Sequence, residues 1–181
     1  NRLPAASANA AQAAQWILAE HAMTWQAWRC QQITDWAAQA RAALQRQRPQ
    51  ALLGAFTVPW RVSDWGGALN TIVGQDLAAL SDHVDVFSPM AYHRMCGQPV
   101  EWIAQVTLDA SRASGKPIWP IIQSVDKPDP LPVEEYGRAL ECALGAEGAE
   151  GVIVFTLEGL LAGKLEVTVS RFREHVGPEP R

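Results

Sequence analysis

Four short, mainly apolar runs recur along the chain at a nearly constant spacing. They begin at Ala51, Asp85, Pro117 and Gly151, so their starts lie 34, 32 and 34 residues apart. Each run is followed by a loop and then by apolar and polar positions with the 3.6-residue period of an amphipathic helix. The pattern predicts strands over 52–58, 84–89, 118–123 and 152–157, and helices over 68–81, 100–114, 133–146 and 165–175.

This alternation of strand and helix favours a parallel sheet. Strands that helices cover on both faces read as continuous apolar runs, as these do. Strand–helix–strand units of one parallel sheet have right-handed crossovers. Gly115 is a natural C-cap for the helix over 100–114, and Pro132 stands where the next helix begins. We therefore expect four consecutive βα units over 51–176.

A long helical segment precedes the first predicted strand. Residues 8–47 have a helical pattern, and we expect a break near Met23 and Thr24. The chain is thus divided into a helical segment over 1–50, the βα units, and a frayed tail over 177–181.

The expected fold class is α/β, with the four βα units forming half of a TIM-type (β/α)8 barrel after the helical segment. A complete barrel takes ~250 residues, and this chain has 181. Three architectures remain open: the C-terminal half of a barrel whose first half is elsewhere, a four-stranded open sheet, or a half-barrel completed by a second copy. Because the chain begins with Asn1 and has no signal-peptide pattern, we expect residues to precede it, and the sequence indicates no localisation.

Composition and charge argue against several classes of partner and site. A net charge of -4 and a pI near 5.5 argue against a nucleic-acid partner, because phosphate binding needs a basic surface. The sequence has no apolar run of about 18 residues, so no membrane span is expected. Cys30, Cys96 and Cys142 have no metal-ligand spacing, which predicts reduced thiols and no metal site. Gly66 and Gly67 fit no phosphate-binding loop, so no cofactor is expected.

Polar and aromatic side chains gather where the predicted strands end. In parallel α/β proteins the functional face lies at the C-terminal ends of the strands. The stretch VDVFSPMAYH, residues 84–93, begins as a buried strand and ends with an aromatic ring and an imidazole at that edge. The candidate residues at this edge are Trp60, Met90, Tyr92, His93, Gln123, Asp126 and Glu158.

Asp126 and Glu158 are the candidate catalytic residues. Neighbouring strands lie about 4.8 Å apart, so carboxyls at their ends fall within the range of about 5 to 9.5 Å that glycosidases use. One carboxyl donates a proton to the leaving oxygen and the other attacks or activates water. Partial desolvation beside Tyr92 and Trp60 is expected to raise the pKa of Glu158 towards a proton donor's range. The alternative for Asp126, which precedes KPDP, is the capping of a turn.

The aromatic and amide residues are candidates for substrate binding. Trp60 is a possible stacking platform, and Tyr92 either bonds a polar ligand or packs with its hydroxyl in water. His93 is an acid/base group, a ligand contact or a turn residue. In GQDLAAL, Gln75 and Asp76 open a helix that faces the same edge, although helix capping explains Asp76 equally well.

The stretches FTVPW, VGQDLAAL, DVFSPMAYHRM and GVIVFTLEGL resemble the C-terminal half of glycoside-hydrolase-like (β/α)8 barrels of bacteria, a group loosely related to chitinase-like barrels. The resemblance implies that Met90 and Tyr92 form a Met-x-Tyr motif whose side chains enter the sugar site. The segment WRCQQITDWAAQAR resembles the fourth helix of these proteins, and NRLP resembles the end of their fourth strand, with Arg2 as the matching residue. Their acidic fourth-strand motif does not occur in this chain.

The resulting hypothesis is a glycoside hydrolase that acts on a poly- or oligosaccharide by carboxylate acid/base chemistry. The alternative is a non-catalytic carbohydrate-binding domain that keeps the aromatic edge. A half-barrel leaves the strands that begin at Leu52 and Val152 without outer partners. We therefore expect either a missing N-terminal half-barrel or self-association.

Overall fold

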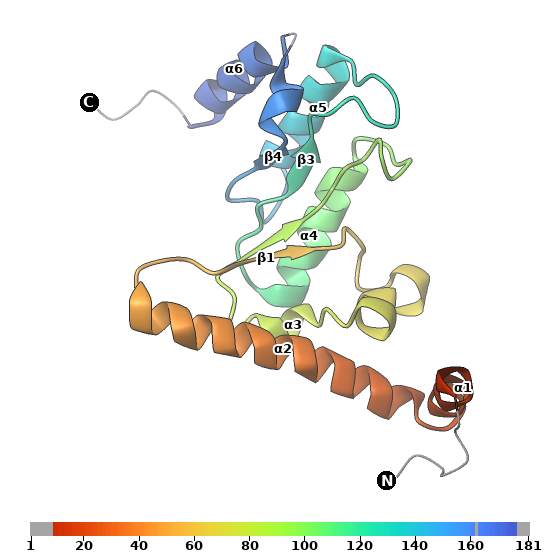
Figure 1. Cartoon of the computed structure of the whole chain (residues 1–181). Helices are drawn as coiled ribbons and strands as arrows, with labels where there is room; N and C mark the ends of the chain where they lie inside the picture. The colour runs from red at the N-terminus through yellow and green to blue at the C-terminus, as the bar shows by residue number, and fades with distance from the viewer. Residues whose placement is uncertain (1–8, 162, 177–181) are drawn as a thin grey trace.

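The computed structural model describes residues 9–161 and 163–176 (Figure 1). Its α-helices are α1 (Ala10–Glu20), α2 (Ala22–Gln47), α3 (Leu77–Leu80), α4 (Trp102–Ser114), α5 (Val133–Leu144) and α6 (Lys164–Val176). Its strands are β1 (Gly54–Thr57), β2 (Val86–Pro89), β3 (Ile121–Gln123) and β4 (Ile153–Phe155). Short 3-10 or π turns are η1 (Asp64–Gly66), η2 (Leu69–Val73) and η3 (Leu157–Leu160).

The strands form two separate two-stranded sheets. β1 pairs with β2 and β3 pairs with β4, both in parallel. In the described part of the chain, the two pairs are connected by isolated bridges alone: Ile118, just before β3, bridges to Phe87 of β2 and to Ala149, just before β4. The expected half of a TIM-type barrel, with four βα units around one continuous sheet, is therefore wrong for this chain.

Two prolines explain why the third predicted strand does not connect the two pairs into one continuous sheet. Pro117 and Pro120 flank Ile118 and Trp119, and a proline has no N–H to give to a sheet ladder. The remaining amides in this stretch make single contacts: Trp119 N–H donates to the Phe87 carbonyl at 2.9 Å, and Ile118 N–H donates to Gly148 at 3.1 Å. Regular pairing resumes only at Ile121, three residues after the predicted start of the strand.

The helices follow the predictions more closely than the sheet does. The predicted break in the first segment occurs at His21, where α1 ends and α2 begins. Gly115 is the C-cap of α4, with the left-handed φ of 65° that favours glycine. The single helix predicted over 68–81 is wrong, because Gly74 takes a φ of 79° and separates η2 from α3.

Apolar side chains form two cores that lie along the molecule. One core joins α2, α3 and α4 to β2, with Phe87 and Ile118 fully buried. The other joins α4, α5 and β3, with Tyr136 and Ile122 fully buried, and α6 packs against it. Figure 1 shows α2 at one end of the molecule, α5 and α6 at the other, and the strands between them. In the described part of the chain, no helix is both long and apolar enough to cross a membrane.

Candidate functional site

A cavity of about 360 Å³ lies beside the ends of β3 and β4. The loop after β3, the turn η3 and the first residue of α6 surround it. Its charged lining residues are Asp126, Glu158 and Lys164, and apolar walls are contributed by Leu131, Pro132 and Leu161. The structure thus places both predicted catalytic carboxyls on one cavity.

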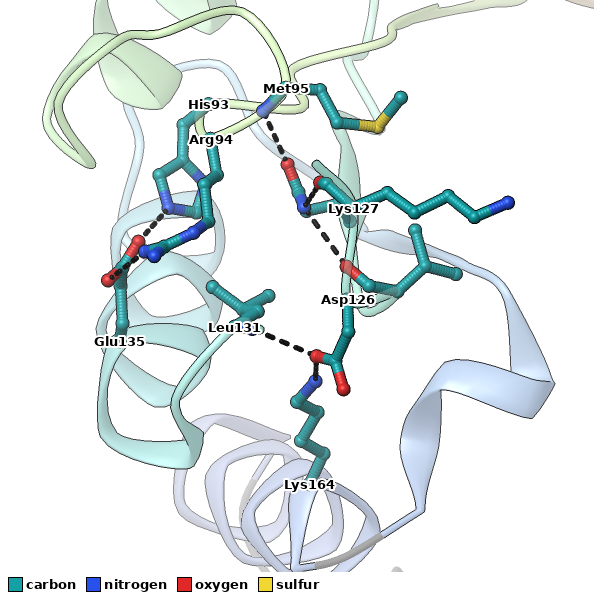
Figure 2. A network of polar contacts seen from close by, with 10 residues as sticks. His93, Arg94, Met95, Asp126, Lys127, Leu131, Glu135 and Lys164 are labelled. Atoms are coloured by element: carbon teal, nitrogen blue, oxygen red, sulfur yellow. Dashed lines mark hydrogen bonds and ion pairs between the residues drawn. The ribbon is translucent and has the colours of Figure 1, made fainter. Parts of the chain in front are cut away.

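Lys164 holds Asp126 in place. Its ammonium donates to Asp126 Oδ1 at 2.8 Å and to the Ser124 carbonyl at 2.7 Å, and the lysine side chain is only 5% exposed. The backbone N–H of Leu131 donates to the same carboxylate oxygen at 2.9 Å (Figure 2). The ion pair with Lys164 and this second hydrogen bond hold the pKa of Asp126 below its ordinary value. Asp126 is therefore an ionised acceptor at neutral pH.

Glu158 is exposed, on the turn η3. The hydrogen-bonding side chain of Thr156 and the backbone N–H of Glu158 itself lower the pKa of this carboxyl below its ordinary value. The expected rise of its pKa is therefore wrong, because solvent and two donors reach the carboxyl that was expected to be desolvated.

A glycine fixes the position of η3 against β3. Gly159 lies so close to Ser124 that a Cβ at this position would collide with both the backbone and the side chain of the serine. The Ser124 hydroxyl donates to the Thr156 carbonyl at 2.6 Å, and Ser124 N–H donates to the Phe155 carbonyl at 2.7 Å. Together these contacts hold Glu158 at the edge of the cavity.

His93 is buried and belongs to a separate cluster with the half-buried Glu135 and Arg94. His93 Nε2 lies 3.0 Å from Glu135 Oε1, and Arg94 Nη1 donates to Glu135 Oε2 at 2.8 Å (Figure 2). Burial raises the pKa of Glu135, but the hydrogen bonds from His93 and Arg94 outweigh it and leave this pKa below its ordinary value. Among the described residues, His93 Nδ1 and Arg94 Nε have no hydrogen-bond partner. The predicted site residue His93 thus ties the loop after β2 to α5.

The buried Gln123 side chain bonds the loop after β2 to the loop after β3. Its Oε1 accepts from Met95 N–H at 2.9 Å, and its Nε2 donates to the carbonyls of Val125 at 3.1 Å and Lys127 at 3.0 Å. The side chain is fully buried and both of its donor hydrogens are used within the protein. Gln123 therefore shapes the loop that carries Asp126.

Tyr92 stacks on Phe155 across the strand ends, with ring centroids 5.2 Å apart and planes at 29°. Phe155 is 43% exposed, so this pair presents an aromatic surface near η3. Met90 is half-buried and its N–H donates to the Thr57 carbonyl at 3.0 Å. Tyr92 is half-buried as well, and burial raises the pKa of its hydroxyl.

The remaining predicted residues lie elsewhere or outside the described residues. Trp60 meets Trp65 edge-on, at 5.0 Å between centroids, and neither ring lines the cavity at Asp126. Gln75 accepts from Val58 N–H and donates to the Phe56 carbonyl, so it ties down the loop after β1. Arg2 lies outside the described residues. The expected convergence on one pocket therefore holds for Asp126 and Glu158, but not for Trp60, Tyr92 and His93.

Asp76 takes the capping role that was its alternative. It is the N-cap of α3, and its side chain accepts from Ala79 N–H at 3.1 Å. In the described ranges, no group of three or more His, Cys, Asp or Glu side chains is arranged to hold a metal ion.

Sequence reasoning missed Lys164 and Glu135. A signal for Lys164 was present, because a cation at the first residue of a helix opposes the helix dipole and therefore indicates a specific partner. Glu135 lies at the start of α5, and nothing local to it in the sequence indicated the contact with His93, 42 residues away.

Comparison of the chain with protein-family models, with curated proteins and with solved structures finds no match. The arrangement of its own residues is therefore the basis for any functional conclusion.

Proposed function

We propose that the cavity beside Asp126, Glu158 and Lys164 binds a carbohydrate. The observation that carries this proposal is that three charged side chains share one cavity whose other walls are largely apolar. Pockets for small molecules have volumes of about 300 to 1,000 Å³ and combine apolar walls with a few placed polar groups. A sugar has the matching surface, with hydroxyls at its edge and C–H groups on its faces.

The charge states of the two carboxylates support recognition of hydroxyl groups. An ionised carboxylate is a pure acceptor with two oxygens, and adjacent sugar hydroxyls are donors that match it. Asp126 already accepts from Lys164 and Leu131. Asp126 is held in an ion pair with Lys164, whereas Glu158 has no ion-pair partner among the described residues, so we assign the principal sugar contact to Glu158.

The pair formed by Tyr92 and Phe155 provides a second element of such a site. Phe155 precedes Glu158 by three residues, and its carbonyl is bonded to the backbone at Ser124, next to the cavity. An exposed aromatic face offers apolar contact to the C–H face of a sugar ring, and the Tyr92 hydroxyl adds a polar group. The proposed site extends from the cavity onto this aromatic surface.

Hydrolysis of a glycosidic bond is the second candidate function, and the shared position of Asp126 and Glu158 favours it. A glycosidase needs one protonated carboxyl as the general acid and one ionised carboxylate. Both pKa values are lowered here, so neither carboxyl is held protonated near neutral pH. Binding without turnover is therefore the leading function, and hydrolysis would require the bound substrate to change one of these pKa values.

Isothermal titration calorimetry tests the binding function. The probes are short oligomers of glucose, xylose and N-acetylglucosamine in their different linkages. We expect at least one of them to bind, and we expect Glu158→Gln to weaken that binding about tenfold or more, the scale of one charge-assisted hydrogen bond. The matched control is Glu147→Gln, an exposed acid outside the cavity. Equal affinities for all three proteins, or no binding of any oligomer, would contradict the proposal.

Release of reducing ends from the same oligomers distinguishes the two functions. A hydrolase that uses Glu158 should lose roughly 10²-fold or more of its turnover in Glu158→Gln, the usual scale of general acid–base catalysis. Binding without any release of reducing ends would establish the non-catalytic function.

A further inference from the structure

The outward side of α2 carries a row of exposed tryptophans. Trp25, Trp28 and Trp36 are 37%, 52% and 73% exposed. Eleven residues separate the first from the last, which is about three helical turns, so the three rings lie on one side of the helix. Trp25 and Trp28 stack with centroids 5.0 Å apart. The buried residues of α2, Cys30, Thr34 and Ala37, face the core instead.

α2 has four charged residues among its 26, Arg29, Asp35, Arg41 and Arg46, and of these Asp35 and Arg46 are exposed. Arg29 donates to the carbonyls of Thr71 and Ile72, and Arg41 pairs with Asp85, so both arginines serve the chain's own fold. Asp35, the single acid of α2, accepts from Gln31. Solvated helices usually carry many charges, whereas the centres of protein interfaces are depleted of charge and enriched in tryptophan.

The same face continues across an apolar groove to β1. A cavity of about 370 Å³ lies between Trp36, Ala37 and Ala40 of α2 and residues 53–56. Phe56 is 63% exposed beside it.

Among the described residues, β1 pairs only with the strand β2. On its other edge the Gln75 side chain already bonds the Phe56 carbonyl and the Val58 N–H, so the Gly54 N–H and C=O and the Phe56 N–H remain for a further strand. The strand β1 contains no charged residue and no proline, the residue types that block the addition of a strand at an edge. We call Trp25, Trp28, Trp36, Phe56 and this edge the α2–β1 face.

The aromatic rings of the α2–β1 face supply more than half of the area that a standard dimer interface buries on each partner. The exposed parts of its four aromatic rings amount to roughly 500 Å², taking about 200 to 250 Å² for a complete ring side chain. The largest apolar patch on a typical monomer is about 300 to 600 Å² in total. A standard interface buries about 800 Å² on each partner, so the remaining area would come from backbone and polar side chains around the rings.

We propose that the α2–β1 face binds a second copy of this chain around a two-fold axis. A two-fold contact brings each residue near its own copy, so like charges would oppose one another. This face is almost free of charge, although each chain carries a net charge of -4, so it is well suited to self-contact. Two β1 strands related by such an axis run antiparallel and can exchange the N–H and C=O groups of Gly54, in the part of the edge that Gln75 leaves free.

Sedimentation velocity of the full chain over a concentration series tests this proposal. We expect a dimer whose dissociation constant rises at least 100-fold in Trp36→Asp, because the substitution removes the most exposed ring and places a carboxylate from each copy in the apolar contact. Trp28→Asp should weaken the dimer in the same direction. The control is Leu157→Asp, which changes an apolar residue that is 78% exposed at the other end of the molecule and should leave the dimer unchanged.

Hydrogen exchange at β1 provides a second readout. The Gly54 and Phe56 amides face the open edge, and we expect Trp36→Asp to reduce their protection while circular dichroism confirms an unchanged fold. A wild-type monomer at all concentrations would overturn the proposal. A dimer that Trp36→Asp leaves intact, or that Leu157→Asp weakens equally, would overturn it as well.

Discussion

The cavity at Asp126 and the α2–β1 face are built in contrasting ways. Figure 1 shows α6, which contributes Lys164 to the cavity, and α2, which carries the exposed tryptophans, at opposite ends of the molecule. Charged groups at the cavity are bonded within the protein, as Lys164 is to Asp126 and Ser124. The α2–β1 face instead leaves large apolar rings in solvent and has almost no charge. The first arrangement positions polar groups for a small ligand, and the second gains stability only when another surface covers it.

Substitutions should therefore separate the two regions. At the polar end, removal of one partner leaves buried polar groups unpaired and lowers the stability of the single chain. At the α2–β1 face, a substitution should change association and leave the folded chain almost unaffected.

The largest effect is expected for Gln123→Leu. The leucine fills a similar volume but leaves Met95 N–H and the carbonyls of Val125 and Lys127 without their partner. We expect a loss of about 3 kcal/mol or more in the free energy of unfolding, measured by urea denaturation. Gln98→Leu, at an exposed position, is the control. A loss below about 1 kcal/mol would show that the Gln123 side chain does not hold the two loops together.

Glu135→Leu is expected to cost about 2 to 3 kcal/mol, because Arg94 and His93 lose a shared partner. The pKa of Glu135 is lowered from its ordinary 4.5 by folding. Its contribution is therefore complete above pH 4.5 and is lost as the pH falls below that value towards the pKa in the folded state. Urea denaturation from pH 7 to pH 3 should show a smaller acid-induced loss in Glu135→Leu than in the wild type. Parallel pH profiles for the two proteins would contradict this assignment.

A smaller loss, about 2 kcal/mol, is expected for Lys164→Met, which keeps the length of the side chain but removes the donor to Ser124 and Asp126. Release of Asp126 should also weaken carbohydrate binding. The control is Lys127→Met, which changes an exposed residue next to Asp126 in the loop after β3. Unfolding and binding data that do not distinguish the two variants would remove Lys164 from the site.

The smallest change in stability is expected for Trp36→Asp. In dilute solution, where the wild type is itself monomeric, its free energy of unfolding should fall by less than about 0.5 kcal/mol, as for most exposed positions. Thermal and urea denaturation at low concentration measure this value. A loss of 2 kcal/mol or more would mean that Trp36 stabilises the single chain, and the contrast between the two regions would fail.

The sequence predicted the helices better than the sheet. Apolar periodicity located α4, α5 and α6 within a few residues, because each helix is set by its own pattern and caps. Strand pairing depends on partners distant in the chain, and the effect of Pro117 and Pro120 on the third strand was not recognised. The single helix predicted over 68–81 is also interrupted, by the left-handed Gly74.

For the candidate site, the positions of the predicted strand ends placed Asp126 near Glu158. Both residues do line one cavity, because they follow neighbouring parallel strands. Position along the chain could not give the direction of their pKa shifts, which depends on Lys164 and Thr156. It also could not show that the Gln123 side chain is turned inward to backbone groups. The partners of a polar side chain at a strand end are set by tertiary contacts that no local pattern encodes.

The central claim is that the cavity at Asp126 and Glu158 is a carbohydrate site, and nuclear magnetic resonance of the isotope-labelled chain tests it most directly. The probe is whichever oligosaccharide binds in calorimetry. We predict that its addition shifts the backbone amide signals of Leu131, Gly159 and Leu161, which line the cavity. Saturating oligosaccharide that leaves these three signals in place, or that shifts only signals of α2 or of the loop with Trp60 and Trp65, would contradict the account.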